Sequence, residues 1–449
     1  MANKTLITNA QIVGAPSLAP YTVGWVLIDG ERIEAIGAGT PEATMQAEAT
    51  IVDAAGAVAM PGLIDTHVHF REPGLTHKGD IATESRAAVL GGITSYIEMP
   101  NTNPATTTAE AFADKMKRAA GRSFGNYGFM LGASDGVMDE IAKIPANELP
   151  SIKLFMGTTT GGMAMPPADQ LDTMLRFCAE KKIPVVVHAE DNDIIAANAA
   201  AAVASYGSKD AVPVSEHHRI RSVEACTSCT RRAIDMAREY GLRLHIAHLS
   251  TAEEAAEIAK ARKEVPGLTA ETTPMYLCVD KSPEFTTTWR IKINPAVKGS
   301  VPELGKALED GTIDTIATDH APHLREEKQG GALTAASGAP SVQFALVMLL
   351  NEFSPELIAS KMAFAPAKLF GIENRGSIAP GNFADIVITE KCPVHTITDA
   401  DVKAPCAWTP FDGRTVNHRV AHVWVNGRHT VNNGEICGEA AGEALIFNR

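Results

Sequence analysis

Eight apolar, strand-like runs alternate with helix-like segments through the middle of the chain, and this alternation constrains the fold more than any other feature. Amphipathic or alanine-rich stretches such as 109–120 and 252–262 separate most of the runs. Strands that alternate with helices in this number predict an α/β fold, a (β/α)8 barrel of the TIM type. The predicted strands are 63–69, 95–100, 127–132, 152–156, 184–190, 242–250, 268–277 and 315–321.

The two ends of the chain carry a different pattern, in which short alternating runs are separated by tight-turn signals. Asp29-Gly30 near the start and Asn426-Gly427 near the end are hairpin signals of this kind. We predict that the two ends pair into one small β-sandwich domain. The predicted division is 1–58 with 377–449 for this composite domain, and 59–376 for the barrel.

Composition excludes several classes of protein. The formal net charge of the 449 residues is −13, which argues against nucleic acid or an acidic membrane surface as partner. No apolar run reaches a membrane-spanning length, and the start lacks a signal-peptide layout, so a cytoplasmic protein is expected. The seven cysteines are odd in number and scattered, which favours reduced thiols. Cys226 and Cys229 lie in a segment with helical periodicity, where packing is the favoured interpretation.

Metal-competent side chains occupy the ends of several predicted strands. His67 and His69 are two residues apart on one strand, so both imidazoles point the same way. His188, His248 and Asp319 each close another apolar run. Because the carboxyl ends of barrel strands meet at one mouth, these five side chains predict a divalent-metal site. His245 is three residues from His248, and we expect it to pack outward against a helix.

Lys153 lies within the apolar run 152–156. Burial of an ammonium group is costly and lowers its pKa. One outcome is addition of carbon dioxide to the neutral amine, which gives a carbamate long enough to bridge two metal ions. The alternative is a lysine that extends to the rim of the barrel. Beside four histidines and an aspartate, the carbamate is the favoured interpretation.

The chain resembles the cyclic-amidohydrolase branch of the amidohydrolase superfamily, and within it the dihydroorotases. The resemblance runs from the N-terminal β-segment to the tail at 376–387 and includes the lysine of the lysine-bearing bacterial type. Its most specific motifs are His69-Phe-Arg-Glu-Pro-Gly74, Met99-Pro-Asn-Thr-Asn-Pro104, His248-Leu-Ser-Thr251 and Thr318-Asp-His-Ala-Pro-His323.

The resemblance implies two divalent metal ions, with zinc as the expected metal. One ion would be held by His67, His69 and Asp319, the other by His188 and His248, and carboxylated Lys153 would bridge them. Asp319 would also be the catalytic proton carrier in the reversible, metal-dependent conversion of L-dihydroorotate to N-carbamoyl-L-aspartate, a step of pyrimidine biosynthesis. The substrate carboxylate would be bound by Arg71, Asn101 and His323, because guanidinium and amide groups suit a carboxylate. Asn294 is a further candidate for contact with the ring.

Two alternatives remain open. Allantoinases and dihydropyrimidinase-type hydantoinases share the metal ligands but act on rings without this carboxylate, and Arg71 with Asn101 favours the dihydroorotase reading. A metal-free, inactive partner of aspartate carbamoyltransferase is the other alternative, although all the expected ligands are present. A homodimer is the expected assembly, and association with aspartate carbamoyltransferase is a further partner hypothesis. The polar, glycine-rich segment 324–340, just after the eighth strand, predicts a mobile rim loop, and 157–162 is a second candidate.

Overall fold

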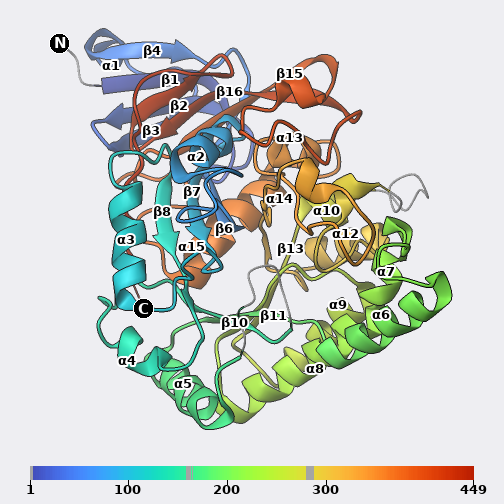
Figure 1. Cartoon of the computed structure of the whole chain (residues 1–449). Coiled ribbons are helices and arrows are strands. Elements are labelled where there is room, and N and C mark those ends of the chain that lie inside the picture. Colours follow the sequence, from blue (N-terminus) through green and yellow to red (C-terminus); the bar gives the residue numbers. More distant parts are fainter. Residues whose placement is uncertain (1–3, 158–162, 164, 280–287, 449) are drawn as a thin grey trace.

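The computed structural model describes residues 4–157, 163, 165–279 and 288–448, and it confirms the predicted (β/α)8 barrel (Figure 1). Parallel pairing runs from β6 to β8 and from β9 to β14. The barrel strands are β6 (Leu63–Val68), β7 (Ile93–Glu98), β8 (Asn126–Phe129), β9 (Leu131–Gly132), β10 (Ile152–Phe155), β11 (Val185–His188), β12 (Leu244–Ile246), β13 (Leu268–Thr272) and β14 (Thr315–Ile316).

Two contacts close these strands into a barrel. β8 and β9 are separated only by Met130, whose N–H donates to the carbonyl oxygen of Glu98 at 3.0 Å; together they occupy one strand position. At the other seam, Val68 forms a parallel bridge with His320, and the N–H of His69 donates to His320 O at 2.8 Å. The first and last strand positions therefore meet beside the predicted metal ligands.

Helices cover the outside of the barrel, and several begin at a residue whose side chain caps the first turn. In α8 (Val223–Tyr240), the Ser222 side chain accepts from the N–H of Ala225, and Gly241 ends the helix at a φ of 69°. The principal covering helices are α2 (Ile81–Leu90), α3 (Ala109–Ala119), α4 (Val137–Ile141), α5 (Ala168–Lys181), α6 (Asn192–Tyr206), α7 (His217–Ile220), α8 (Val223–Tyr240), α9 (Ala252–Ala261), α10 (Pro274–Cys278), α12 (Val301–Glu309), α13 (Ala345–Leu349) and α14 (Pro355–Ala359). Cys226 and Cys229 are buried on α8 as predicted. None of the helices in the described ranges has the length and apolar character to cross a bilayer.

The predicted strand at 268–277 is too long. β13 ends at Thr272, and Pro274 occupies the first turn of α10. Proline suits the first turn of a helix, where its missing N–H costs nothing, so the apolar run continues as a helix.

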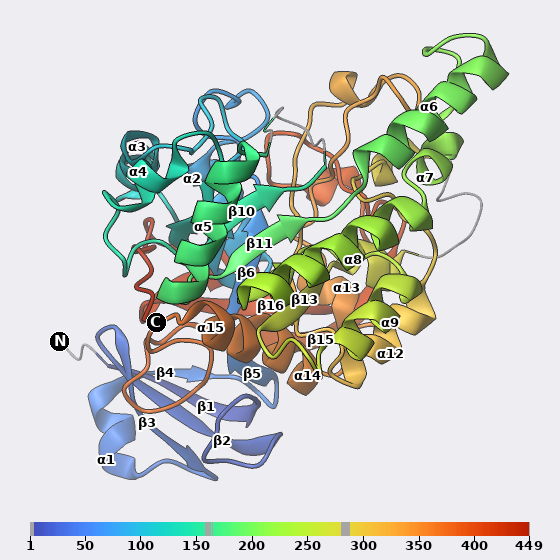
Figure 2. The same cartoon turned by 90° about the horizontal axis from the view of Figure 1, so that it is seen from below.

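Strands from both ends of the chain form one nine-stranded sheet beside the barrel (Figure 2). β5 pairs with β1 from the N-terminal part and with β15 from the C-terminal part. The predicted domain division at residues 58 and 376 stays a prediction, and β5 continues to Pro61. The strands are β1 (Lys4–Ile12), β2 (Thr22–Asp29), β3 (Arg32–Ala38), β4 (Ala49–Asp53), β5 (Val58–Pro61), β15 (Ile386–Thr396), β16 (Thr415–Val425), β17 (Arg428–Asn432) and β18 (Glu435–Ile436).

One helix, α15 (Ala365–Phe370), lies against the barrel next to the terminal sheet (Figure 2). Its Phe370 is buried in an apolar cluster with inward-facing strand residues such as Ile64, Ile97 and Val186. This apolar cluster fills the end of the barrel opposite the predicted metal ligands. The candidate site is therefore at the other end.

Candidate metal and substrate site

Three of the predicted ligands converge at the seam between β6 and β14. The side chains of His67, His69 and Asp319 each offer a ligand atom, and these atoms all lie within 4.8 Å of one another. Asp319 Oδ1 is 3.3 Å from His67 Nε2 and 3.1 Å from His69 Nε2. Two imidazoles and one carboxylate oriented toward a common point suit a divalent transition metal.

The second predicted pair lies beside this group. His188 Nδ1 is 2.8 Å from His248 Nε2, and the rings of His67 and His248 have centroids 5.2 Å apart. The structure thus brings together all four predicted histidines and Asp319.

The remaining ring nitrogens of three histidines contact side-chain oxygens. His67 Nδ1 lies 2.9 Å from Glu271 Oε1, His188 Nε2 lies 2.9 Å from Glu190 Oε2, and His69 Nδ1 lies 2.7 Å from Asn101 Oδ1. A ring N–H donated to each oxygen leaves the other nitrogen with a lone pair, which faces the centre of the group. Carboxylate or carbonyl partners of this kind fix the tautomer and orientation of metal-binding histidines.

Glu271 and Glu190 were missed from the sequence. Each is an acidic residue at the end of an apolar strand-like run. Its position in an apolar run predicts a buried carboxylate, and this was the signal that could have identified both residues. Glu190 also pairs with Arg221.

All four histidines are held in the neutral form. Burial lowers the pKa of His67, His69, His188 and His248, and for His248 the neighbouring imidazoles lower it further. Neutral imidazole is the form that binds metal. Burial also raises the pKa of Asp319, which brings this carboxyl closer to the range in which it can carry a proton.

Lys153 is buried on β10 and faces the inside of the barrel. Burial lowers the pKa of its ammonium group to about 8, and the Lys153 charge in turn lowers the pKa of His67 and of Asp319. Among the residues that the structure describes, none is a hydrogen-bond partner of Lys153 Nζ. A buried amine without a partner is costly as it stands.

His245 faces inward, so the prediction that it packs outward is wrong. Lys153, Val186 and His245 are register partners on β10, β11 and β12, and register partners lie on the same face of a sheet. His245 Nε2 is 3.5 Å from Glu271 Oε2, and its ring lies 6.0 Å from that of Phe370. β12 ends at Ile246, and the left-handed φ of His248, 38°, breaks the alternation that the prediction assumed.

Asp319 is positioned from the neighbouring strand by a residue that the sequence reasoning also missed. Asp65 on β6 accepts from the N–H of Thr318 at 3.0 Å and from its hydroxyl at 2.6 Å. Asp319 itself has a left-handed φ of 48°. Non-glycine residues in this region store about 1–3 kcal/mol of strain and cluster at functional sites.

Arg71 lies at the mouth of the barrel and is only 3% exposed. Its Nε donates to Pro322 O at 3.0 Å, and Nη2 lies 3.2 Å from His323 Nε2. Within the described ranges, no carboxylate oxygen lies within the 4.0 Å of an ion pair with this guanidinium. Burial lowers the pKa of Arg71 to about 10, so it remains a cation at neutral pH.

The two predicted amide contacts are placed as follows. Asn101 follows β7, and its side-chain oxygen Oδ1 accepts from His69. This residue therefore links the predicted metal ligands to the barrel mouth. Asn294 Oδ1 lies 3.1 Å from His217 Nε2, in the segment that precedes Pro295. His217 Nε2 also lies 2.9 Å from the carbonyl oxygen of Ile293.

The predicted rim loop at 324–340 is anchored by a buried lysine. Lys328 Nζ donates to the carbonyl oxygens of Lys292 and Gly338, both at 2.8 Å. The segment therefore packs against the barrel beside His323 rather than standing free of it. The second candidate loop, 157–162, lies outside the described residues after Gly157.

The donor set fits the two metal ions that the sequence predicts. Four neutral imidazoles, a shared carboxylate and a buried amine without a hydrogen-bond partner in the described part of the chain meet in one place. Imidazole nitrogens and carboxylate oxygens are ligands that zinc and similar ions accept. The carbamate of Lys153 would add the two oxygens that this amine lacks.

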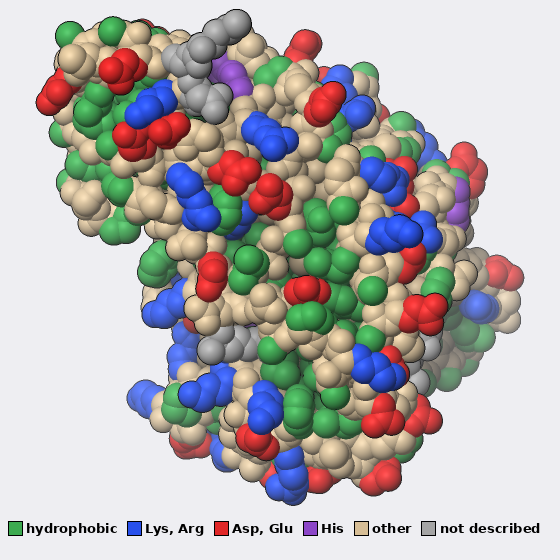
Figure 3. All heavy atoms as spheres, turned by 90° about the vertical axis from the view of Figure 1, so that its left-hand side faces the viewer, with side chains coloured by type: hydrophobic (Ala, Val, Ile, Leu, Met, Phe, Trp, Pro, Cys, Tyr) green, Lys and Arg blue, Asp and Glu red, His purple; other side chains and the backbone are tan. Residues whose placement is uncertain are grey.

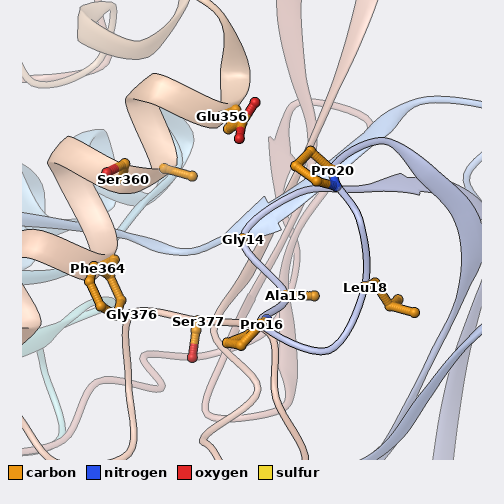
Figure 4. Close-up of a pocket in the computed structure, with 11 residues that line it drawn as sticks. Gly14, Ala15, Pro16, Leu18, Pro20, Glu356, Ser360, Phe364, Gly376 and Ser377 are labelled. Carbon is orange, nitrogen blue, oxygen red and sulfur yellow. The ribbon is translucent and has the colours of Figure 1, made fainter. Parts of the chain in front are cut away.

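Other surface features are separate from this site. A pocket between the 14–20 loop and α14 is lined by none of the predicted ligands (Figure 4). On the face shown in Figure 3, acidic and basic side chains are interspersed with hydrophobic ones rather than gathered by sign. That face does not present the basic patch expected of a nucleic-acid-binding protein.

Comparison with known proteins agrees with this geometry. Dihydroorotase from Halobacterium salinarum is 35% identical to this chain, over 88% of it and 90% of the relative. Dihydroorotase from Lactobacillus gasseri is 31% identical, over 95% of this chain and 96% of the relative.

Among solved structures, the L-hydantoinase (dihydropyrimidinase) from Arthrobacter aurescens is similar with a TM-score of 0.91 and 28% identity, over 98% of this chain and 99% of that one. The dihydropyrimidinase from Brevibacillus agri has a TM-score of 0.88 and 28% identity, over 99% of this chain and 100% of that one. The amidohydrolase family model matches residues 58–430. With its histidine and aspartate ligands converging at the mouth of a (β/α)8 barrel, this chain belongs to the amidohydrolase family.

Proposed function

We propose that the chain is a dihydroorotase, which interconverts L-dihydroorotate and N-carbamoyl-L-aspartate in pyrimidine biosynthesis. The observation that carries this proposal is the buried guanidinium of Arg71 beside the predicted metal ligands, which forms no ion pair with a carboxylate of the described residues. An unpaired buried cation needs an anionic ligand, and the ring of dihydroorotate bears a carboxylate. The names of the relatives in the sequence comparison support the same reaction.

We assign two divalent ions, expected to be zinc, to the ligand group. His67, His69 and Asp319 would hold one ion, and His188 and His248 would hold the other. Carboxylated Lys153 would bind both ions. When bound, such a pair supplies hydroxide near neutral pH and polarises a carbonyl group. Burial lowers the pKa of Lys153 to about 8, which increases the share of neutral amine near neutral pH, and the neutral amine is the form that reacts with carbon dioxide.

Asp319 is the proposed proton carrier. In the hydrolytic direction, water adds to the ring carbonyl carbon, and Asp319 takes the proton that the water loses. The bond from this carbon to the ring nitrogen then breaks, and Asp319 delivers the proton to that nitrogen. Burial raises the pKa of the carboxyl, which favours the protonated state needed between the two transfers.

Arg71, Asn101 and His323 position the substrate in this proposal. Arg71 binds the substrate carboxylate through its planar guanidinium, and the other two side chains add hydrogen bonds. Fixing the carboxylate fixes the ring carbonyl over the reacting group. Asn294 is proposed to contact the far edge of the ring.

The similarity to hydantoinases supports one competing function, a dihydropyrimidinase-type activity. Purified protein should be assayed side by side on L-dihydroorotate, allantoin, hydantoin and dihydrouracil, with metal content measured on the same sample. We expect two metal ions per chain and a kcat/KM for dihydroorotate well above that for the carboxylate-free rings. Faster turnover of hydantoin or dihydrouracil would refute the assignment, and a metal-free inactive protein would support a purely structural partner role.

We also expect a homodimer in solution. Light scattering coupled to size-exclusion chromatography measures its mass, and co-elution with aspartate carbamoyltransferase tests the partner hypothesis.

A further inference from the structure

Lys78 is a buried lysine at the mouth of the barrel, in the loop between β6 and α2, and the proposed mechanism does not use it. It is 8% exposed. Its Nζ lies 2.7 Å from Glu327 Oε1 and 3.2 Å from His323 Nδ1. Glu327 belongs to the anchored segment after β14, so Lys78 joins two loops that border the proposed substrate site.

His323 contacts groups on both sides of its ring. Nδ1 lies 3.2 Å from Lys78 Nζ, whereas Nε2 lies 3.1 Å from Ser337 O and 3.2 Å from Arg71 Nη2. Burial, together with the charges of Arg71 and Lys78, lowers the pKa of His323 far below its usual range. The imidazole is therefore neutral and carries a single proton, on one nitrogen or the other.

The position of that proton follows from the partners. An ammonium group only donates hydrogen bonds, so the nitrogen that faces Lys78 must offer a lone pair to be bonded. Arg71 likewise only donates and faces Nε2, so the acceptor decides between the two nitrogens. The carbonyl oxygen of Ser337 lies 3.1 Å from Nε2 and accepts its proton when no substrate is bound, which leaves Nδ1 to accept from Lys78. The opposite tautomer places an N–H against the ammonium of Lys78, and the carboxylate oxygen Glu327 Oε2 on that side of the ring is 3.5 Å away.

We propose that Lys78 is a positioning residue that fixes His323 as the Nε2–H tautomer, so that His323 and Arg71 present adjacent N–H donors to one anionic group. The assignment of that group as the substrate carboxylate rests on the proposed function. Without Lys78, Nε2 can accept from Arg71 Nη2 instead, and His323 then offers a lone pair toward the carboxylate. The neutral Nε2–H donor, by contrast, adds a hydrogen bond to an anion.

Other contacts hold the ring in place whichever tautomer it adopts. The carbonyl oxygen of His323 accepts from Trp408 Nε1 at 2.7 Å. Gly338 packs against the ring so closely that an added Cβ would lie 2.9 Å from His323 Cδ2. Replacement of Lys78 should thus change the protonation of the ring more than its position.

Neutron diffraction from perdeuterated crystals locates the proton of His323 directly. We expect a deuterium on Nε2 and none on Nδ1 in the wild-type protein and in Lys78→Arg, which keeps a donor. Lys78→Met should move deuterium to Nδ1. A wild-type map with deuterium on Nδ1 overturns the proposal without any variant.

Kinetics supply the second readout. Lys78→Met should raise the KM for dihydroorotate about tenfold, the loss of roughly one charge-assisted hydrogen bond, with kcat within about twofold. Lys78→Arg should restore most of the loss. The matched control is Lys143→Met, which breaks an exposed pair with Glu140 of 2.6 Å and should leave both parameters unchanged. An unchanged KM in Lys78→Met overturns the proposal. Absence of dihydroorotate turnover in the wild type refutes the proposed function instead, and the neutron map still decides the tautomer.

Discussion

Replacing Arg71 with methionine tests the substrate assignment, because it removes the buried cation while keeping most of its packing volume. Arg71 is 3% exposed, and its Nη2 lies against the neutral ring of His323. In the proposed complex, the substrate carboxylate is the missing counter-ion. The variant would leave that carboxylate buried at the mouth without its partner.

The expected loss follows from this burial. Removing one member of a buried charge pair costs about 3–5 kcal/mol, which corresponds to a decrease of about 150-fold to 5,000-fold in kcat/KM for dihydroorotate. The same change should not lower kcat/KM for a carboxylate-free ring such as dihydrouracil. Metal content should stay at the wild-type value, since Arg71 is not among the ligands.

The assay is steady-state hydrolysis of both rings by the wild type, Arg71→Met and a matched surface variant. Arg176→Met is the control, because Arg176 is 67% exposed and pairs with Asp172 on its own helix. Equal losses on both rings would mean that Arg71 supports the barrel mouth rather than the carboxylate. No loss on dihydroorotate would refute the reasoning altogether.

Three further changes test other parts of the site. Lys153→Met should halve the metal content measured by mass spectrometry of the metals. It should also abolish the carbamate signal that wild-type protein gives by NMR after growth with ¹³C-bicarbonate. Two retained ions would contradict the bridging role. Glu271→Gln should weaken metal affinity about 10–100-fold in competition with a chelator, because Glu271 orients His67, and unchanged affinity would count against this. His217→Gln should make stability less sensitive to acid. Burial lowers the pKa of His217 to about 3, so the unfolded chain binds the additional proton between pH 6.5 and 3. The stability contribution is therefore complete above pH 6.5 and falls with decreasing pH by at most about 1.4 kcal/mol per pH unit. Urea midpoints from pH 7.5 to 4.5 measure this slope, and parallel slopes in the two proteins would argue against it.

The alternation of strand and helix could be predicted because the period of the apolar residues is a local property. The exception was the run at 268–277, where a buried strand and the buried helix after Pro274 have the same apolar character. The closure of the barrel at Val68 and His320 is a long-range pairing. It was predicted only from the general rule that eight strands alternating with helices close into a barrel.

Strand ends identified the four histidines and the aspartate that converge, because chain direction alone brings strand ends to one mouth. The orientation of His245 could not be predicted in this way, since it depends on where β12 ends and on the left-handed backbone at His248. Glu190 and Glu271 were missed for another reason. They act through the imidazoles they contact, and a sequence gives no distance between groups so far apart along the chain.

The position of β5 has a consequence for biosynthesis of the polypeptide. β5 lies between β1, which is made before it, and β15, which is made only after every barrel strand. At about 5–20 residues per second, the nascent chain carries one unpaired edge of β5 for on the order of half a minute. During that interval the exposed edge is a docking place for chaperones or for other unfinished copies. Ribosome pausing between the codons for β5 and those for β15 would therefore increase aggregation more than pausing before β5.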